Sequence, residues 1–346
     1  MSGRNLRFPA AAVAVVALCG LLAVHGAAAR TPSPTMSDFQ PGDFTSASDL
    51  DWWLLGTARC GEVKCLRIVR TEDGGRTFVV VPAPPGSTSV QATVGHLRFA
   101  NERDGYAFGP ESWSTHDGGR TWRQVPIGYA SDLAAADGYA YALVSDRGSS
   151  ELMRSPVDRD RWKALPTPGV PLSLEAHGKT VFVETQRRVL ISDDRGAHFR
   201  PGGRIPVGVG CQFDTAAGTP VLWALCFRAA ANPGGELLRS ANAGASWRRL
   251  TAGGIQNQPI EGFAAAAADI WVVAGYQGLY RTTDGGATWS QASGLPTGFS
   301  AFYLGFTDAT HGVAIGGHGN GRHWTIRLYF TSDGGASYHL IPIGRS

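Results

Sequence analysis

The chain has 346 residues, of which 43% are hydrophobic and 17% are charged, and its formal net charge is +3. It is long enough to bury a sizeable core, in one large domain or two ordinary ones. A nearly neutral chain has no basic footprint for nucleic acid or an anionic membrane surface, so we expect neither as a partner.

The first 29 residues are set apart by their composition. Arg4 and Arg7 precede an apolar run over 10–24, and three alanines at 27–29 supply small residues for cleavage. This pattern predicts a secretory signal peptide over 1–29, cleaved near Ala29, with an apolar core that is short for a membrane span. Lipidation of Cys19 is an alternative, disfavoured by the bulky residue before it. We therefore expect a secreted or extracytoplasmic protein, whose net charge falls to +1 once the two arginines are removed.

Residues 30–42 contain the stretch TPSPTMSDFQPG, which is typical of a flexible tether. The folded part is then predicted to cover residues 43–346. After residue 29, no apolar stretch is long enough to cross a bilayer.

Four cysteines remain after the signal peptide, which in an oxidising compartment suggests two disulfides. Four cysteines allow three pairings, and proximity favours Cys60–Cys65 and Cys211–Cys226. A zinc site is disfavoured, because the C-x4-C spacing is wide and no histidine lies near either pair. We expect no metal and no cofactor.

A short pattern recurs along the rest of the chain, as in residues 281–289, RTTDGGATW. An Asp-Gly-Gly turn is followed three residues later by an aromatic residue. The Asp or Asn positions of the seven copies are Asp73, Asp117, Asp158, Asp194, Asn242, Asp284 and Asp333. Their separations run from 36 to 49 residues, and the mean of about 43 is the length of one four-stranded propeller blade.

The chemistry of this turn is local. Its carboxylate can accept the N–H groups of its own turn, the glycines supply positive φ, and the aromatic ring packs beneath the hairpin. Each copy is therefore expected to fix the same hairpin in each blade. We interpret the seven Asp and Asn residues as structural rather than catalytic.

These stretches resemble the Asp-box, or bacterial neuraminidase (BNR), repeat S/T-x-D-x-G-x-T-W/F. The repeat occurs in sialidases, xyloglucan-cleaving hydrolases, sortilin-type receptors and photosystem II stability/assembly factors. FANERDGYAFG at 99–109 and FTDATHGVAIGG at 306–317 most resemble the assembly-factor branch. The resemblance implies an all-β protein, a single seven-bladed β-propeller of four-stranded antiparallel blades, with Asp-box hairpins between the third and fourth strands. It also implies that these turns face away from the ligand site.

If the strands of a blade are named A to D in chain order, the sixth blade has A at 261–267, B at 270–274, C at 278–282 and D from 288. The A–B and C–D turns share one end of the ring, and the B–C loops and D-to-A links share the other, where we expect the site. In this scheme Cys60–Cys65 closes the B–C loop of the first blade, and Cys211–Cys226 joins strands A and B of the fifth.

The B–C end offers polar side chains that suit a polar or acidic ligand, although exposed loops are often polar simply because water surrounds them. The ligand-binding candidates are Arg147, Arg187, Arg228, Tyr276, His318, Asn320, Arg322 and His323. Glu151 and Glu184, on neighbouring loops, form a weak candidate acid/base pair. Five tryptophans in strands are expected in the core or between blades: Trp52, Trp53, Trp223, Trp271 and Trp324.

Sialidase chemistry is disfavoured, because the only Arg-Ile-Pro, at 204–206, precedes the fifth blade rather than the first repeat. Xyloglucan-cleaving hydrolases resemble two facing propellers, and this chain has one. Phosphate loops, H-E-x-x-H and G-x-S-x-G patterns are missing from the sequence. We therefore predict an exported, monomeric, non-catalytic binding or assembly propeller. It would engage a protein or glycan through the face opposite the Asp boxes, and a glycoside hydrolase is the alternative.

Overall fold

The computed structural model describes residues 36, 38–85, 94–146, 149–186, 188–206, 210–215, 219, 221–227, 235–250, 260–319 and 324–344. The chain divides into two compact units, Met1–Ser33 and Pro34–Ser346, and all described residues belong to the second. The predicted signal peptide and the tether residues 30–35 lie outside the described residues.

Strands make up the regular structure of the second unit, four to each sheet. Blade 1 comprises β1 (Gln40–Ser46), β2 (Trp52–Cys60), β3 (Val63–Thr71) and β4 (Val79–Val81). Blade 2 comprises β5 (His96–Phe99), β6 (Gly105–Phe108), β7 (Trp113–Thr115) and β8 (Arg123–Gln124). Blade 3 comprises β9 (Tyr129–Ala136), β10 (Tyr139–Asp146), β11 (Ser149–Pro156) and β12 (Lys163–Leu165). Blade 4 comprises β13 (Pro171–His177), β14 (Thr180–Thr185), β15 (Arg188–Ser192) and β16 (Arg200–Arg204).

The last three blades follow the same order. Blade 5 comprises β17 (Cys211–Thr215), β18 (Leu222–Cys226), β19 (Glu236–Ser240) and β20 (Arg248–Arg249). Blade 6 comprises β21 (Ile260–Ala265), β22 (Trp271–Gly275), β23 (Gly278–Thr282) and β24 (Ser290–Gln291). Blade 7 comprises β25 (Ser300–Phe306), β26 (Gly312–Gly319), β27 (Trp324–Thr331) and β28 (His339–Ile341).

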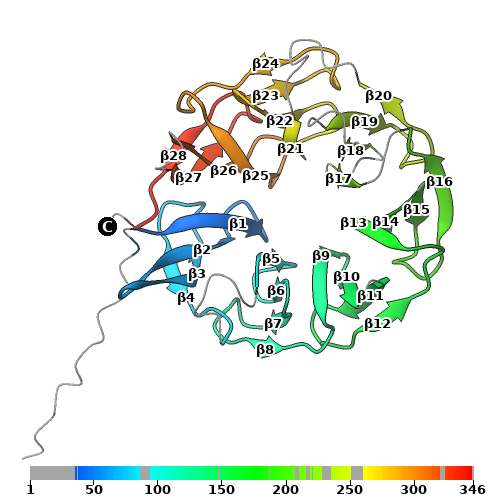
Figure 1. Cartoon of the computed structure of the whole chain (residues 1–346), viewed down its shortest axis with the longest axis horizontal. Helices are drawn as coiled ribbons and strands as arrows, with labels where there is room; N and C mark the ends of the chain where they lie inside the picture. The colour runs from blue at the N-terminus through cyan, green and yellow to red at the C-terminus, as the bar shows by residue number, and fades with distance from the viewer. Residues whose placement is uncertain are drawn as a thin grey trace, which may run out of the picture. The chain divides into compact units, whose positions relative to one another are not determined.

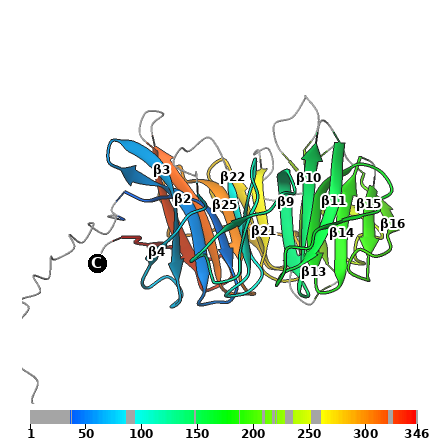
Figure 2. The same cartoon turned by 90° about the horizontal axis from the view of Figure 1, so that it is seen from below.

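The seven sheets stand side by side around a central channel, with the A strands innermost (Figure 1). Seen from the side, the strands run roughly parallel to the channel axis (Figure 2). Every sheet pairs its strands antiparallel in chain order. The predicted seven-bladed propeller of four-stranded antiparallel blades is confirmed. Within the described residues, no helix is long and apolar enough to cross a membrane.

Burial changes across each blade, and this explains the strand sequences. The B strands lie between two neighbouring blades, so β18 (LWALC) and β22 (WVVAG) are buried at every position. A strand covered on both faces reads as a continuous apolar run rather than an alternation. The outermost D strands β20 (RR) and β24 (SQ) are exposed throughout.

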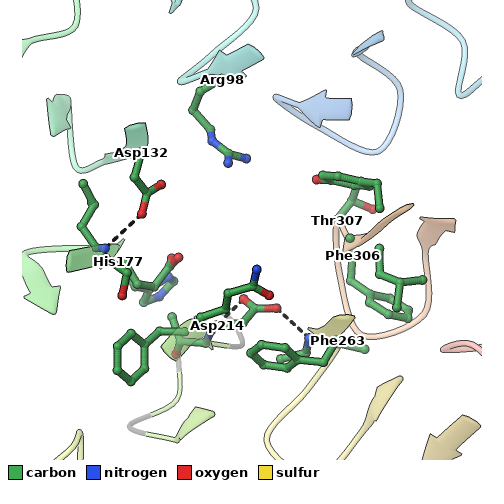
Figure 3. A pocket seen from close by; sticks show the side chains of 18 of the residues that line it. Arg98, Asp132, His177, Asp214, Phe263, Phe306 and Thr307 are labelled. Carbon is green, nitrogen blue, oxygen red and sulfur yellow. Dashed lines mark hydrogen bonds between the residues drawn. The ribbon is translucent and has the colours of Figure 1, made fainter. Parts of the chain in front are cut away.

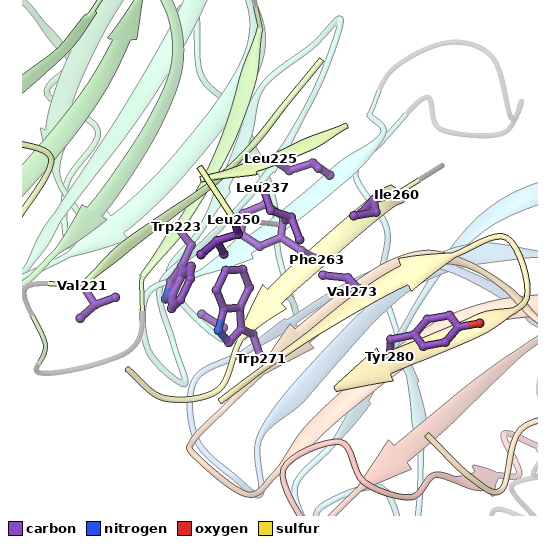
Figure 4. Packing of buried hydrophobic residues seen from close by; sticks show 11 residues of the cluster. Val221, Trp223, Leu225, Leu237, Leu250, Ile260, Phe263, Trp271, Val273 and Tyr280 are labelled. Atoms are coloured by element: carbon purple, nitrogen blue, oxygen red, sulfur yellow. The ribbon is translucent and has the colours of Figure 1, made fainter. Parts of the chain in front are cut away.

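Each interface between neighbouring blades has its own hydrophobic cluster among the described residues. In the cluster between blades 5 and 6, Trp223 and Trp271 pack with Leu237, Leu250 and Phe263 (Figure 4). The ring closes in the same way, since Phe44 and Trp52 of blade 1 pack with Val313 and Leu328 of blade 7. Packing therefore joins the first blade to the last, and in the described part of the chain neither sheet borrows a strand from the other.

The repeated turns lie between strands C and D and share one set of hydrogen bonds. In the first, the Thr71 hydroxyl donates to Asp73 Oδ1 (2.7 Å) and accepts the N–H of Gly75 (3.0 Å). Asp73 Oδ1 also accepts the N–H of Thr77 (2.9 Å), and Oδ2 accepts its hydroxyl (2.6 Å). These bonds hold the pKa of Asp73 down, at about 2. The copies at Asp117, Asp284 and Asp333 repeat the pattern.

Two copies keep the turn with different side chains. His198 replaces the last threonine and places Nδ1 2.6 Å from Asp194 Oδ2. In the fifth blade, Asn242 donates from Nδ2 to the Ser246 hydroxyl (3.0 Å). Arg195 and Ala243 adopt the positive φ that glycine has at the same place elsewhere. The backbone of the turn is thus maintained where its sequence varies.

Asp158 is the exception. Its carboxylate pairs with Arg159 (3.0 Å), and the Ser155 hydroxyl organises the turn instead by donating to Arg159 O and accepting the N–H of Arg161. Asp158-Arg159-Asp160 contains no glycine, and none of the three has positive φ. The Asp-box geometry is therefore not formed here. Asp160 instead accepts hydrogen bonds from Ser114 and Arg123 of blade 2.

The turns also hold their own blades together. The N–H of Gly74 donates to Leu50 O (3.0 Å) in the A–B turn of blade 1, and the N–H of Gly285 donates to Asp269 O (3.1 Å) in that of blade 6. Equivalent bonds occur in blades 2, 4 and 7. The A–B and C–D turns therefore share one end of the ring, which we call the repeat-turn end.

Both predicted disulfides are present, Cys60–Cys65 at the B–C loop of blade 1 and Cys211–Cys226 across β17 and β18. They suit an oxidising compartment. The first strand starts earlier than the predicted tether allows, because residues 40–42 already belong to β1 and Phe39 is buried against blade 7.

Candidate functional site

A cavity of about 850 Å³ occupies the central channel. Its walls are side chains of the A strands and of the A–B turns of blades 6 and 7. Figure 3 shows Arg98, Asp132 and Asp214 reaching into this space from three different blades. Sequence reasoning did not single out any of these residues.

Three channel aspartates link consecutive blades. Asp43 accepts the N–H of Leu97 (2.7 Å), Asp132 that of Leu174 (3.0 Å), and Asp214 that of Ala265 (2.7 Å). In each case the acceptor belongs to one A strand and the donor to the A strand of the next blade. These carboxylates therefore supply partners for N–H groups that face the channel, which is a structural role.

Arg98 carries the permanent positive charge of the described channel lining. Its Nε donates to Leu133 O (3.1 Å) in the next blade. Burial lowers the pKa of this guanidinium, but Tyr303 and the carboxylates of Asp43, Glu175 and Asp132 raise it by more. Arg98 is thus held as a cation among acidic groups.

Glu175 differs from the three aspartates. It lies next to Asp214, and the backbone N–H that it accepts is that of its own neighbour Ala176 rather than one of the next blade. Burial and the charge of Asp214 raise the pKa of Glu175 to about 8, against the opposing effect of Arg98. Burial also raises the pKa of Asp214. Two neighbouring carboxyls that resist ionisation are a common feature of functional sites.

The end of the channel opposite the repeat turns is shaped by β-bulges. In five of the seven A strands the register with strand B shifts by one residue near the start. The extra residues are Gly42, Ser131, Leu172, Glu261 and Phe302, all of them exposed. A bulge redirects the side chain that it adds, and bulges are frequent beside functional sites. We call these five residues the channel mouth.

Aromatic side chains gather at the channel mouth in blade 7. Phe302 is 58% exposed and lines the cavity, and its ring lies 6.1 Å from that of Trp324. Trp324, at the start of β27, is 45% exposed. The expectation that Trp324 belongs to the core is wrong, because β26 and β27 extend beyond the packed part of the blade and their ends are exposed. The other four tryptophans are fully buried.

The predicted site residues meet different environments. Tyr276 is 71% exposed in the B–C loop of blade 6, and Glu151 and His318 are also exposed. Glu184 is buried and accepts the N–H of Cys211 (2.9 Å) and the hydroxyl of Ser173 (3.3 Å), so it links blades 4 and 5. The structure therefore gives Glu184 a structural role instead of a free acid/base position. Arg147, Arg187, Arg228, Asn320, Arg322 and His323 lie outside the described residues.

One group of metal-type ligands lies at the repeat-turn end, formed by Asp49, Asp308 and His311. Asp308 already accepts the N–H groups of Thr310 (2.6 Å) and His311 (2.7 Å), and its other oxygen lies 2.7 Å from His311 Nδ1. These bonds account for the arrangement of Asp308 and His311 without an ion.

No model of a protein family matches this chain. Among curated proteins, it is similar to a photosystem II assembly protein. That protein, Ycf48 of Synechococcus sp. (strain JA-3-3Ab), is 28% identical over 252 residues, which are 71% of this chain and 58% of the relative. The chain thus spans little more than half the length of that relative. The resemblance to assembly factors predicted from 99–109 and 306–317 is confirmed.

Solved structures share the fold at low identity. YCF48 bound to D1 peptide has a TM-score of 0.56 at 19% identity, covering 82% of this chain and 92% of that one. YCF48 from Cyanidioschyzon merolae has a TM-score of 0.58 at 16% identity, covering 87% and 97%. An ancestral GH74 enzyme has a TM-score of 0.58 at 12% identity, and the match covers 89% of this chain and 46% of the enzyme chain. These likenesses establish the propeller fold and nothing beyond it.

Proposed function

We propose that the protein is a non-catalytic assembly or binding propeller that engages a segment of a protein partner at its channel mouth. The observation that carries this proposal is the set of five bulges around one end of the channel, four of which direct an exposed side chain, that of Phe302 among them. Exposed aromatic groups beside a cavity are typical of interaction sites. The curated relative is called an assembly protein, and one structural neighbour is described as bound to a peptide.

Photocrosslinking in the source organism tests the location of this site. Phe302 is replaced by p-benzoylphenylalanine in one variant, and the exposed Thr283 of a repeat turn is replaced in the control. The proposal expects a discrete protein adduct from position 302 and none from position 283. Adducts from position 283 alone would place the binding surface at the repeat-turn end and contradict the proposal.

The compartment belongs to the same proposal. Two disulfides and the sequence of residues 1–29 support export with cleavage after Ala29, so the mature chain would begin at Arg30. Mass spectrometry of the chain recovered from the cell envelope or medium measures this directly. A cytoplasmic chain with reduced cysteines would contradict it.

A glycan ligand or glycoside hydrolysis is the second candidate. It is favoured by one observation, the neighbouring Glu175 and Asp214 carboxyls with raised pKa values in the channel. Turnover of a glycan panel by the native chain, abolished in Glu175→Gln, would establish this candidate. Absence of turnover together with adducts at position 302 would favour the protein-binding function.

A further inference from the structure

The chemistry of the channel mouth indicates which kind of segment it accepts. The cavity that Phe302 lines contains, within its described lining, five carboxyl groups and one guanidinium. Four of the carboxyl groups, Asp43, Asp132, Glu175 and Asp214, are on A strands, the fifth, Asp308, is in an A–B turn at the repeat-turn end, and the guanidinium is that of Arg98. A sixth carboxyl group, Glu261, is exposed on a bulge of the mouth itself. The cavity therefore has an excess of acidic groups.

The described lining has one guanidinium, Arg98, and two imidazoles, His96 and His177, and the first two of these groups are already engaged. Arg98 donates to Leu133 O, and His96 lies 3.6 Å from Asp43. The hydrogen bond from Asp43 raises the pKa of His96 despite its burial. Burial raises the pKa values of Glu175 and Asp214, although Arg98 opposes both shifts. A cationic group from outside would be favoured at this position.

The aromatic pair at the mouth adds a second, apolar requirement. Phe302 and Trp324 expose large ring surfaces to solvent next to the acidic channel. Such rings bury apolar side chains and also bind guanidinium or ammonium groups over their faces. Through Phe302, this apolar surface borders the same cavity that the acidic groups line.

We propose that the channel mouth binds a protein segment that combines an aromatic or large apolar residue with adjacent Arg or Lys residues. The apolar side chain packs on Phe302 and Trp324, and a cationic side chain enters the channel toward Glu175 and Asp214. This inference rests on the proposed function and specifies its partner by charge. Complementarity of charge is what selects a cationic over an acidic segment.

Proton release accompanies such binding. Glu175 faces Asp214 of β17, Arg98 of β5 and Asp132 of β9, and an added cation favours its ionised form. The segment therefore binds the deprotonated channel better, and its affinity rises with pH between about 6 and 9. Glu175→Gln keeps the size of the side chain and removes the contribution of Glu175 to this dependence, while that of Asp214 at the lower end of the range remains.

Fluorescence anisotropy with synthetic peptides tests the proposal on the mature chain. The probe is labelled Gly-Trp-Gly-Arg-Gly-Arg-Gly, and its matched control replaces both arginines with glutamates. We expect the cationic probe to bind at least about tenfold more tightly, and salt to weaken it. Phe302→Ala and Glu175→Gln should each weaken the cationic probe by about tenfold. Leu340→Ala and Glu102→Gln, at exposed sites away from the mouth, should have no effect.

Each alternative outcome has a distinct meaning. Preference for the acidic probe, still dependent on Phe302, would overturn the cationic inference and leave the protein-binding function in place. No binding of either probe, together with no adduct from position 302, would overturn both. Spermidine binding that is unaffected by Phe302→Ala, with no peptide binding, would replace the peptide with a polyamine. Urea unfolding of each variant shows that its fold is intact.

Discussion

At the repeat-turn end, the same atoms meet the same partners in one blade after another, whereas at the channel mouth the five bulges present one glycine and four different side chains. The pKa values of acidic groups diverge in the same way. Hydrogen bonds within the turns lower those of Asp73 and Asp284, while burial in the channel raises those of Glu175 and Asp214. Repetition therefore marks the groups that hold each turn, and the groups that line the channel and its mouth differ from blade to blade.

The largest effect is expected when a tryptophan packed between blades is compared with a tryptophan at the channel mouth. Trp271 is fully buried between blades 5 and 6, and Trp324 is half exposed at the mouth. Trp271→Ala should lower the free energy of unfolding by about 3–5 kcal/mol, because it leaves a large cavity. Trp324→Ala should change it by less than about 0.5 kcal/mol. Urea unfolding followed by circular dichroism measures both.

Equal losses from the two substitutions would contradict the comparison. Trp324 would then contribute to the stability of blade 7, and its exposed ring would no longer indicate a binding surface.

The features that could be predicted from the sequence are local ones. The Asp-Gly turn and its aromatic residue lie within nine consecutive residues, so the number of blades could be predicted by counting the copies of this repeat. Cys211 and Cys226 face each other because the register of β17 and β18 is set by a single hairpin. The prediction of an Asp-box turn at Asp158 was wrong. The spacing of this copy fits the repeat, but its turn lacks the glycine that readily adopts positive φ.

The channel could not be predicted in this way. The acidic groups on its A strands come from four different blades, at Asp43, Asp132, Glu175 and Asp214, and no short spacing connects them. A bulge inserts one residue into a strand without a sequence signature, so Phe302 reads as an ordinary strand residue. Trp324 reads the same way, because exposure depends on where β27 ends relative to its neighbours.

A loss of stability of intermediate size is expected when the repeated turn at Asp117 is compared with the one at Asp158. Asp117 forms the full set of bonds with Thr115 and Thr121, and Asp158 forms none of them. Asp117→Ala should destabilise the chain by about 1–2 kcal/mol through loss of these bonds. Asp158→Ala should leave stability unchanged. Thermal unfolding of the two variants beside the native chain gives the comparison.

The dependence of this effect on pH has a defined sign. Burial raises the pKa of Asp117, but the bonds from Thr121 and Thr115 lower it by more. Because the pKa of Asp117 is lower in the folded chain than its ordinary value of 3.8, the ionised carboxylate stabilises the folded state fully above pH 3.8. This contribution is lost as the pH falls through the pKa of the folded state. The Asp117→Ala difference should therefore shrink in acid. A difference that grows in acid would show that the carboxylate acts through something other than its hydrogen bonds.

The smallest expected effect is at Glu175 and has the opposite sign. The pKa of Glu175 is raised to about 8 in the folded chain, against 4.5 for an ordinary glutamate. Between these values the folded state retains a proton that the unfolded state releases, so rising pH weakens the fold until about pH 8. Glu175→Gln removes this penalty. Because Glu175 lines an open cavity, screening limits the expected gain to the order of 1 kcal/mol above pH 8.

Unfolding curves at pH 4.5 and pH 8.5 separate this effect from a general change in packing. The variant should match the native chain at the lower pH, where both side chains are neutral, and exceed it at the higher pH. Glu102→Gln, exposed in the A–B turn of blade 2, should show no such difference. A Glu175→Gln chain that is destabilised equally at both pH values would mean that the carboxyl is a structural hydrogen-bonding group. The channel would then resemble the repeat turns, and the division between the two ends of the ring would lose its chemical basis.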